Sequence, residues 1–176
     1  LTIAREWENG TMEQLMSTPV RPAEMVIGKM LAFFVVGVVD SVIAVLVGVY
    51  VFHVPLRGNL LLLGVTTCIF LSGALFWGVF ISAAAKTQLL AYQIGILSSF
   101  LPAFLLSGFI YSIENMPVVI QVITHVVPSR YFVTILKGIF LKGVGLEVLW
   151  VPVLLLMVYA AVIFTLATRK LSGKLG

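Results

Sequence analysis

Residues 30–52, MLAFFVVGVVDSVIAVLVGVYVF, decide the fold class of this chain. Asp40 is the single charged residue in this stretch, and nearly every other residue is apolar. A helix of about 20 apolar residues is long enough to cross the roughly 30 Å hydrocarbon layer of a bilayer. The stretch therefore predicts a membrane-spanning helix.

Three further apolar runs, at residues 59–85, 88–111 and 148–168, are long enough to span a bilayer. Of the 176 residues, 61% are hydrophobic and 10% are charged. Soluble domains are about half apolar and a quarter charged. The sequence thus predicts an all-α membrane protein with four transmembrane helices. Its surplus of Lys and Arg over Asp and Glu, 11 against 7, is typical of cytoplasmic membrane-flanking loops and indicates no nucleic-acid partner.

The basic residues also predict an orientation. With the N-terminus in the cytoplasm, the inside group is Arg5, Arg21, Lys29, Lys86, Arg169, Lys170 and Lys174, and the outside group is Arg57, Arg130, Lys137 and Lys142. Positive charge is enriched on the cytoplasmic side of membrane proteins, so this arrangement is favoured. Residues 1–29 are accordingly expected to be a cytoplasmic region.

Residues 116–142 are expected to form a hairpin on the extracytoplasmic side. PVVIQVITHVV (117–127) is too short to span a bilayer, and SRYFVTILKGIFLK (129–142) has an apolar stripe opposite Arg130, Thr134 and Lys137. A break at Pro128 between two short amphipathic helices indicates an interfacial or re-entrant pair. The alternative is that the second helix crosses the membrane. The candidate site residues of the hairpin are Pro128, Arg130, Tyr131 and Lys137.

Asp40 has two interpretations. A charge inside a span costs at least about 2.5 kcal/mol on insertion scales, so it should face protein or water. It either lines a polar path or makes an interhelical hydrogen bond, in which case it could be protonated. Both interpretations stay open at this point.

Small residues recur every four positions in three of the spans and predict where helices pack. The stripes are Gly37, Ser41, Ala44 and Gly48; then Ala74, Gly78 and Ser82; then Gly95, Ser99, Ala103 and Ser107. The span at 148–168 has few small residues and is expected to be peripheral. Pro102 is expected to kink the span at 88–111, because it has no N–H to donate.

Motifs for catalysis are missing from the sequence. There is no G-x-x-x-x-G-K-[ST] phosphate loop, no H-E-x-x-H zinc motif and no G-x-S-x-G nucleophile elbow. His53 and His125 lie far apart in sequence, and His125 is expected to be an interfacial polar residue. The chain is therefore not expected to be an enzyme, nor to hold a metal or cofactor of its own.

The polar stretch REWENGTMEQLMSTPVRP, residues 5–22, differs from everything that follows it. Gly10 is suited to end one helix, and TMEQ is a capping box with Thr11 as N-cap and Gln14 at the third position. Met12 and Leu15 then share an apolar face beside Glu13. Membrane-surface helices favour Lys and Arg on the polar face, whereas this one has an acid, which favours a protein partner.

Three stretches, AREWENGTMEQLMSTPVRPAEMVIGK (4–29), LLSGFIYSIENMP (105–117) and VPSRYFVTILKGIFLKG (127–143), resemble the ABC-2 type transporter permease family, the membrane subunits of bacterial ABC exporters. The resemblance implies a six-span domain whose first two spans precede this chain, often with a large extracellular domain between them. It identifies the opening stretch as a coupling helix that docks into a separate ATPase subunit, and residues 116–142 as two short re-entrant helices. The implied coupling residues are Glu6, Gly10, Thr11, Met12, Glu13, Gln14 and Leu15. Asn9 stands where relatives often carry a charge, which weakens any expectation of a salt bridge there.

The expected function is therefore that of a permease subunit in the bacterial inner membrane. The resemblance implies an ATPase partner that holds ATP and Mg²⁺, and a second permease copy or a paralogue. The substrate is not implied, because relatives export drugs, lipids and glycans. The alternatives are a non-transporting membrane scaffold or channel-like protein and, less in keeping with the missing motifs, an intramembrane enzyme.

Overall fold

The computed structural model describes residues 5, 9–10, 22–85 and 87–175. Residues 1–4, 6–8, 11–21, 86 and 176 lie outside this description, as do the side chains of residues 22–26, 29 and 171–175.

Every element of the described residues is a helix. In chain order they are α3 (Pro22–Tyr50), α4 (Leu60–Ala84), α5 (Gln88–Gly95), the π-helical η1 (Ile96–Phe100), α6 (Leu101–Leu106), the 3₁₀-helical η2 (Ile113–Asn115), α7 (Val118–Thr124), α8 (Pro128–Lys137), the π-helical η3 (Gly138–Lys142) and α9 (Leu146–Leu175). Proline is well suited to the first turn of a helix, where its missing N–H has no partner to lose. Accordingly α3 begins at Pro22 and α8 at Pro128.

Four helical stretches are long and apolar enough to cross a membrane: Met30–Tyr50, Leu60–Ala84, Gln88–Leu106 and Leu146–Lys170. They confirm the four predicted spans. The third ends at Leu106 and not at residue 111, because Gly108 takes a φ of +79° and turns the chain away. A left-handed glycine just past a helix is a common terminator.

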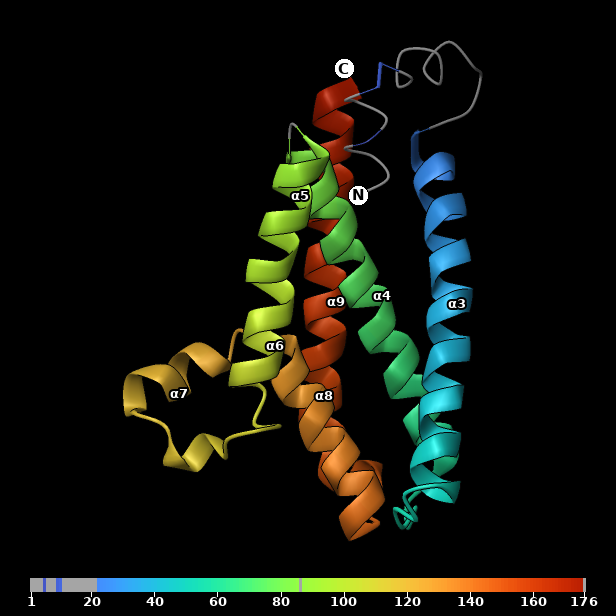
Figure 1. Ribbon diagram of the computed structural model, residues 1–176, viewed down its shortest axis with the longest axis vertical. Helices are drawn as coiled ribbons and strands as arrows, with labels where there is room; N and C mark the ends of the chain where they lie inside the picture. Colours follow the sequence, from blue (N-terminus) through green and yellow to red (C-terminus); the bar gives the residue numbers. More distant parts are fainter. Residues whose placement is uncertain (1–4, 6–8, 11–21, 86, 176) are drawn as a thin grey trace.

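The spans run between two ends of the molecule (Figure 1). The start of α3, the connection from α4 to α5 and the C-terminus lie at one end, while the loop between α3 and α4 and the start of α9 lie at the other. Arg169 and Lys170 are thereby separated from Arg57 and Lys142 by the length of α9. The structure thus divides these basic residues as the sequence predicts.

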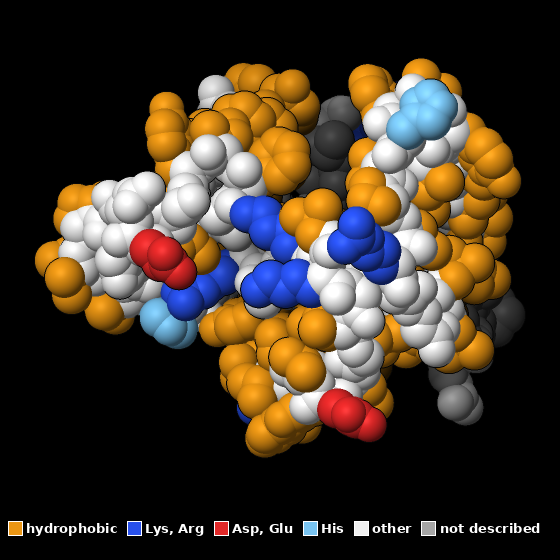
Figure 2. Space-filling view, turned by 90° about the horizontal axis from the view of Figure 1, so that it is seen from below, with side chains coloured by type: hydrophobic (Ala, Val, Ile, Leu, Met, Phe, Trp, Pro, Cys, Tyr) orange, Lys and Arg blue, Asp and Glu red, His pale blue; other side chains and the backbone are white. Residues whose placement is uncertain are grey.

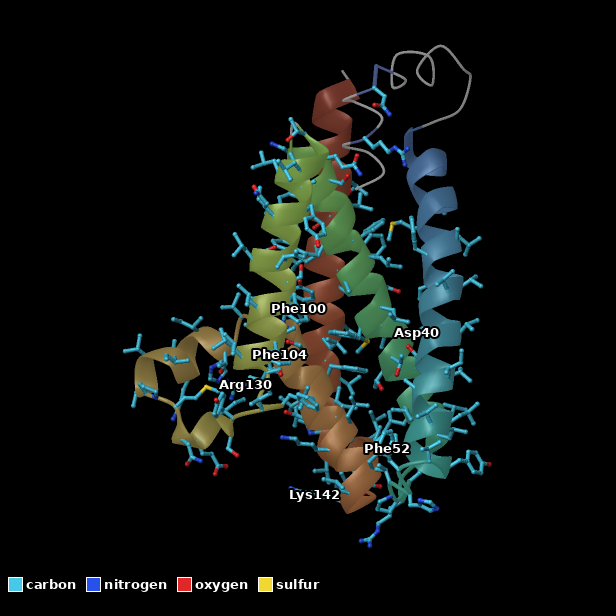
Figure 3. The ribbon with its side chains drawn as sticks, viewed as in Figure 1. Asp40, Phe52, Phe100, Phe104, Arg130 and Lys142 are labelled. Atoms are coloured by element: carbon cyan, nitrogen blue, oxygen red, sulfur yellow. The ribbon has the colours of Figure 1, made fainter. Side chains whose placement is uncertain are left out.

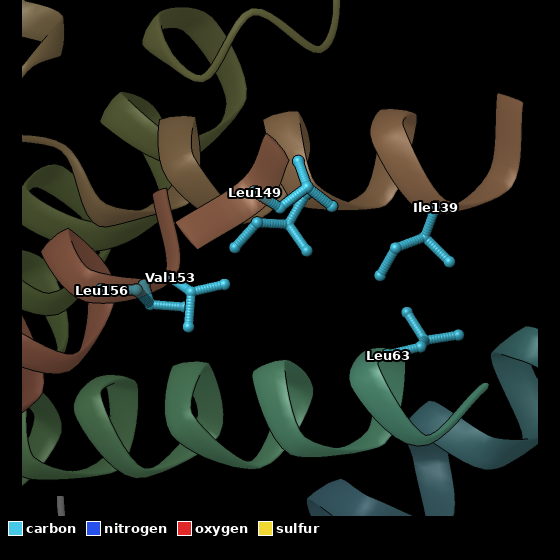
Figure 4. Packing of buried hydrophobic residues seen from close by; sticks show 6 residues of the cluster. Leu63, Ile139, Leu149, Val153 and Leu156 are labelled. Carbon is cyan, nitrogen blue, oxygen red and sulfur yellow. The ribbon is translucent and has the colours of Figure 1, made fainter. Parts of the chain in front are cut away.

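The core lies where α4, α8 and α9 meet. It is built from Leu63 of α4, Ile135 and Ile139 of α8–η3, and Leu149, Val153 and Leu156 of α9 (Figure 4). Ile135 and Ile139 are both 0% exposed. Since helices in lipid associate through close packing and not through exclusion of water, these interdigitated side chains hold the three helices together.

The position of α9 contradicts the expectation that it is peripheral. Residues 146–170 are the most buried of the four spans, with 22% of their most apolar window inside the structure. Branched side chains on α9 fill the core, and the Tyr159 ring and the Ala160 methyl lie at ordinary contact distance from a Cβ placed at Gly73 of α4. The burial of α9 thus comes from large branched side chains, which a count of its small residues does not reveal.

The loop between α3 and α4 packs directly on η3 at two glycines. A Cβ at Gly58 would lie 2.8 Å from the carbonyl oxygen of Ile139 and 3.0 Å from its Cγ2. Gly143 takes a φ of +64°, and a Cβ placed there would lie 3.1 Å from the Cβ of Arg57. Glycine is required at both positions, because the two backbones approach too closely for a side chain.

Replacing Gly58 by Ala should destabilise the full-length protein, because the new methyl group meets backbone atoms that cannot move aside independently. We expect a loss of about 1–3 kcal/mol, typical of overpacking, measured as a lower unfolding midpoint in detergent. Gly64→Ala is the matched control, since nothing lies within 4 Å of its Cβ position. Equal unfolding midpoints for the two variants would contradict the packing described here.

Candidate functional site

Helices α7 and α8–η3 form a sharply bent pair beside the bundle. The axes of Val118–Thr124 and Pro128–Lys142 differ by 88° across a short break. At 1.5 Å per residue, Pro128–Lys142 is roughly 22 Å long, which is short for a bilayer crossing. In Figure 1, α8 starts near α6 and descends to the end where α3 meets α4. By length and composition, such a bent pair is either one broken span or a re-entrant loop.

Arg130 joins the two arms of the bent pair (Figure 3). Its Nη1 donates to the Gln121 carbonyl oxygen at 3.2 Å and to the Thr124 hydroxyl, and lies 3.0 Å from Nδ1 of His125. The last carbonyl groups of a helix lack partners within the helix and carry partial negative charge. The guanidinium therefore serves as a cationic cap for the C-terminal end of α7.

Tyr131 and Gln121 complete this connection. The Tyr131 hydroxyl donates to the His125 carbonyl oxygen at 2.6 Å, and the Gln121 amide donates to the Met116 carbonyl oxygen at 2.8 Å. Gln121, Thr124 and His125 share one face of α7, and the structure brings that face to the first turn of α8. The bend at Pro128 is thus fixed by side chains and does not depend on the proline alone.

The apolar face of α8 is seated in the protein. The Phe132 ring stacks on Phe70 of α4 with centroids 4.3 Å apart and planes 2° apart. At the end of the helix, Lys137 Nζ donates to the Gly108 carbonyl oxygen at 2.6 Å, which ties α8 to the turn after α6. The apolar stripe of this helix packs on α4 and α9. Tyr131 instead turns to α7.

A cleft separates α4 from α5 and η1. It has a volume of about 250 Å³ and is lined by Ala74, Gly78, Ile81, Ser82, Ala91, Tyr92, Gly95, Ile96, Ser99 and Phe100. Two of the predicted small-residue stripes face each other across it, but nothing lies within 4 Å of a Cβ placed at Gly78 or Gly95. These stripes therefore line a hollow and do not make the expected close contact. Gly37 does pack closely, since a Cβ there would lie 3.2 Å from Leu71 of α4.

The cleft lies beside the irregular turn of the third span. The segment η1 precedes Pro102, and the Trp77 indole N–H donates to the Ser98 hydroxyl at 3.2 Å, which ties α4 to η1. A π-helical turn shifts the hydrogen-bond register where a proline has no N–H to contribute. The disturbance expected at Pro102 takes this form, and Gln88–Leu106 remains one span. The two opposed small-residue stripes are the only sign of this cleft in the sequence, and they were expected to mark a close contact.

Asp40 lies within α3, near the middle of its length (Figure 3). Its side chain is exposed and forms no hydrogen bond or ion pair with any residue that the structure describes. The neighbouring Ser41 hydroxyl bonds within its own helix, to the Gly37 carbonyl oxygen at 2.7 Å. The interhelical hydrogen bond considered above is therefore not made by the described part of the chain.

The expected coupling residues lie mostly outside the described residues: Glu6, Thr11, Met12, Glu13, Gln14 and Leu15. Gly10 is described, with a φ of +69°. Just before it, the Asn9 N–H donates to the Arg5 carbonyl oxygen at 3.0 Å, a bond of helical spacing. A left-handed glycine after such a bond is the geometry of a helix end. Elsewhere in the described residues, no group of His, Cys, Asp or Glu side chains could hold a metal ion.

The family described as ABC-2 type transporter matches residues 1–141. The chain is 39% identical to the probable multidrug ABC transporter permease YbhS of Escherichia coli K12 over 99% of its length and 46% of the relative's. It is 35% identical to the probable multidrug ABC transporter permease YbhR of the same organism, over 85% of the chain and 40% of the relative. It is 32% identical to the inner membrane transport permease YhhJ of Escherichia coli K12, over 99% of the chain and 46% of the relative. The chain thus spans about half the length of these relatives. No solved structure shows a significant match.

Replacing Arg130 by Ala should loosen α7, because the cationic cap on its last carbonyl groups is lost. We expect faster hydrogen–deuterium exchange over residues 118–127, with the free energy of local opening lower by about 1.5 kcal/mol. This value is at the low end for a hydrogen bond to a charged group, because the site is partly exposed to solvent. Thr134→Ala is the control, since that exposed hydroxyl bonds only to the Arg130 carbonyl oxygen of its own helix. Unchanged exchange in Arg130→Ala would show that α7 is held by other contacts.

Proposed function

Because this chain belongs to the ABC-2 type transporter family, we propose that it forms part of the membrane-spanning permease subunit of an ATP-driven exporter. The observation that carries the proposal is the 39% identity, along 99% of the chain, to a probable multidrug ABC transporter permease. The four apolar spans, together with a relative named as an inner membrane permease, make the chain part of a multi-pass inner-membrane protein. Since it spans about half the length of its relatives, the whole transporter needs further segments.

The translocation path is proposed to include the cleft between α4 and η1 and the face of α3 that carries Asp40. The cleft is open and mostly apolar, as sites for small apolar molecules are. Asp40 is an unpartnered acid within a span, and such residues commonly mark substrate paths. An Asp40→Asn variant should therefore transport less than Ser41→Ala at equal abundance, and equal transport would remove Asp40 from the path.

Energy is proposed to come from a separate ATPase subunit that binds ATP and Mg²⁺. The contact with it is assigned to the coupling residues in the stretch 6–15, which precedes α3 in the chain. A second copy of the permease, or a paralogue, would complete the pathway. These partners follow from the family resemblance, and an acid beside an apolar knob is chemically suited to a basic-rimmed groove.

The bent pair α7–α8 is proposed to be re-entrant from the extracytoplasmic side. Three features support this: the 88° bend, the short length of Pro128–Lys142, and the position of both arms beside the end that carries Arg57. Irregular backbone at membrane depth is tolerated where it is buried in protein, and here α4 and α9 cover the apolar face of the α8–η3 arm.

Damage to the coupling stretch should uncouple the transporter without unfolding its membrane part. The double variant Glu13→Lys plus Leu15→Ala reverses the charge and shrinks the apolar face of the expected helix. Drug efflux and drug-stimulated ATP hydrolysis should both fall at least roughly tenfold, as when a charged contact at an interface is reversed. Both are measured in membranes that contain the complete transporter at matched permease levels.

Ser17→Ala is the matched control for this experiment, because it alters the same expected helix away from its apolar face. Normal efflux and normal ATPase stimulation in the double variant would show that the helix is only a membrane anchor. If the unmutated permease and its ATPase show neither efflux nor stimulated ATP hydrolysis with any drug tested, the scaffold or channel-like alternative is favoured.

Cysteine labelling tests the side on which the hairpin lies. Asn115→Cys and Gly145→Cys, introduced singly into a cysteine-free full-length protein, flank the bent pair and are exposed. Both should react with an impermeant thiol reagent added outside the cytoplasmic membrane. Gly145 is preferred to Gly143, whose positive φ would strain a cysteine. Reaction of only one of the two would mean that Pro128–Lys142 crosses the membrane.

A further inference from the structure

Three cations gather at the end of the molecule where α3 meets α4. Arg57 lies in the connecting loop, Lys137 ends α8 and Lys142 ends η3, and all three are exposed. Figure 2 looks onto this end and shows Lys and Arg side chains in the middle of the face, with the acidic side chains at its margins. The acids near this end are Glu114 of η2 and Glu147 in the first turn of α9. We call Arg57, Lys137 and Lys142 the basic patch.

The packing of the backbone brings these charges together. Gly58 and Gly143 allow the loop between α3 and α4 to touch η3, which sets Arg57 beside the residue that follows Lys142. In the π-helical η3, hydrogen bonds run between residues five apart, so Lys137 and Lys142 come about one turn apart along the helix. The patch is thus set by rigid elements and not by flexible side chains alone.

The protein leaves most of this charge without a partner. Arg57 and Lys142 form no hydrogen bond or ion pair with any described residue, and Lys137 makes one hydrogen bond, to the Gly108 carbonyl oxygen. Arg130 is different, because its guanidinium is committed to the end of α7. Like charges held together repel each other, so an anion from the surroundings would stabilise the patch.

Exposed aromatic and apolar side chains place the patch at membrane-surface depth. Tyr50 ends α3, Tyr111 follows α6 and Trp150 lies in the second turn of α9; their exposed fractions are 73%, 64% and 57%. Tyr and Trp are enriched where the hydrocarbon layer meets the headgroups. Phe52, in the same loop as Arg57, and Leu141, next to Lys142 in the chain, are also exposed. The cations therefore stand at the depth of lipid phosphates, with apolar neighbours suited to acyl chains.

We propose that the basic patch of Arg57, Lys137 and Lys142 binds the phosphate group of an anionic phospholipid in the leaflet that meets this end of the protein. A lipid is favoured over a free anion because the same surface offers both cations and exposed apolar side chains. This inference requires the chain to sit in a membrane but does not depend on the proposed export function.

The test uses the complete permease in nanodiscs with photoactivatable phosphatidylglycerol, and a phosphatidylcholine analogue of the same chains for comparison. Cross-linked peptides are identified by mass spectrometry. Phosphatidylglycerol should label residues 51–61 and 138–150 well above phosphatidylcholine. In Arg57→Gln plus Lys142→Gln, this labelling should fall roughly tenfold, since each cation at an anionic surface contributes to binding. The variant replaces exposed side chains without described partners, so the fold should be kept, as a circular dichroism spectrum can verify.

Arg169→Gln plus Lys170→Gln is the matched control, because it removes the same charge from exposed positions at the opposite end. It should leave labelling of residues 51–61 and 138–150 unchanged. Equal labelling by the two lipids, or unchanged labelling in the patch variant, would overturn the proposal. So would full displacement of the lipid by millimolar inorganic phosphate, which would identify a site for free anions. Failure of Arg57→Cys to react with a thiol reagent in lipid-free detergent would mean that another part of the protein covers the patch, and would also overturn it.

Discussion

The structure depends on the seating of α8 between α4 and α9. Ile135 and Ile139 are fully buried there, against Leu63 on one side and Leu149 on the other. A 15-residue amphipathic helix of this kind has no stable place of its own in hydrocarbon, because its polar face carries Arg130 and Lys137. The protein removes this instability in two ways. The apolar face of α8 packs against two spans, and its cations bond to helix and turn carbonyl groups.

This seating has consequences at both ends of α8. At its start, Arg130 and Tyr131 hold the end of α7 and so set the 88° bend. At its end, the π-helical η3 brings Gly143 against the loop between α3 and α4 and gathers the basic patch. The contact surface of one short helix thereby determines the shape of the whole extracytoplasmic end proposed here.

The other half of the bundle is less tightly packed. Between α4 and α5, small side chains leave a cleft of about 250 Å³, and the Trp77–Ser98 hydrogen bond fastens one point beside it. A second hollow of about 240 Å³ lies among α3, α4 and α9. Such gaps are compatible with the transport proposed above, whereas the core around α8 is closely packed.

The sequence by itself determined the fold class, the four spans and the division of basic residues between the two ends. Hydrophobic length and charge are properties of single segments, so they can be read before any helix has a neighbour. The break at Pro128 was equally readable, and α8 begins there as proline permits, although Gly108 ended the third span earlier than its hydropathy indicated. The tertiary structure alone decided which faces meet. It placed α9 in the core because branched side chains of α9 pack on those of α4 and α8, and it opened a cleft between two small-residue stripes that composition could equally assign to contact. Whether small residues bring helices together or leave a space depends on contacts between segments far apart in the chain, which no single segment reveals.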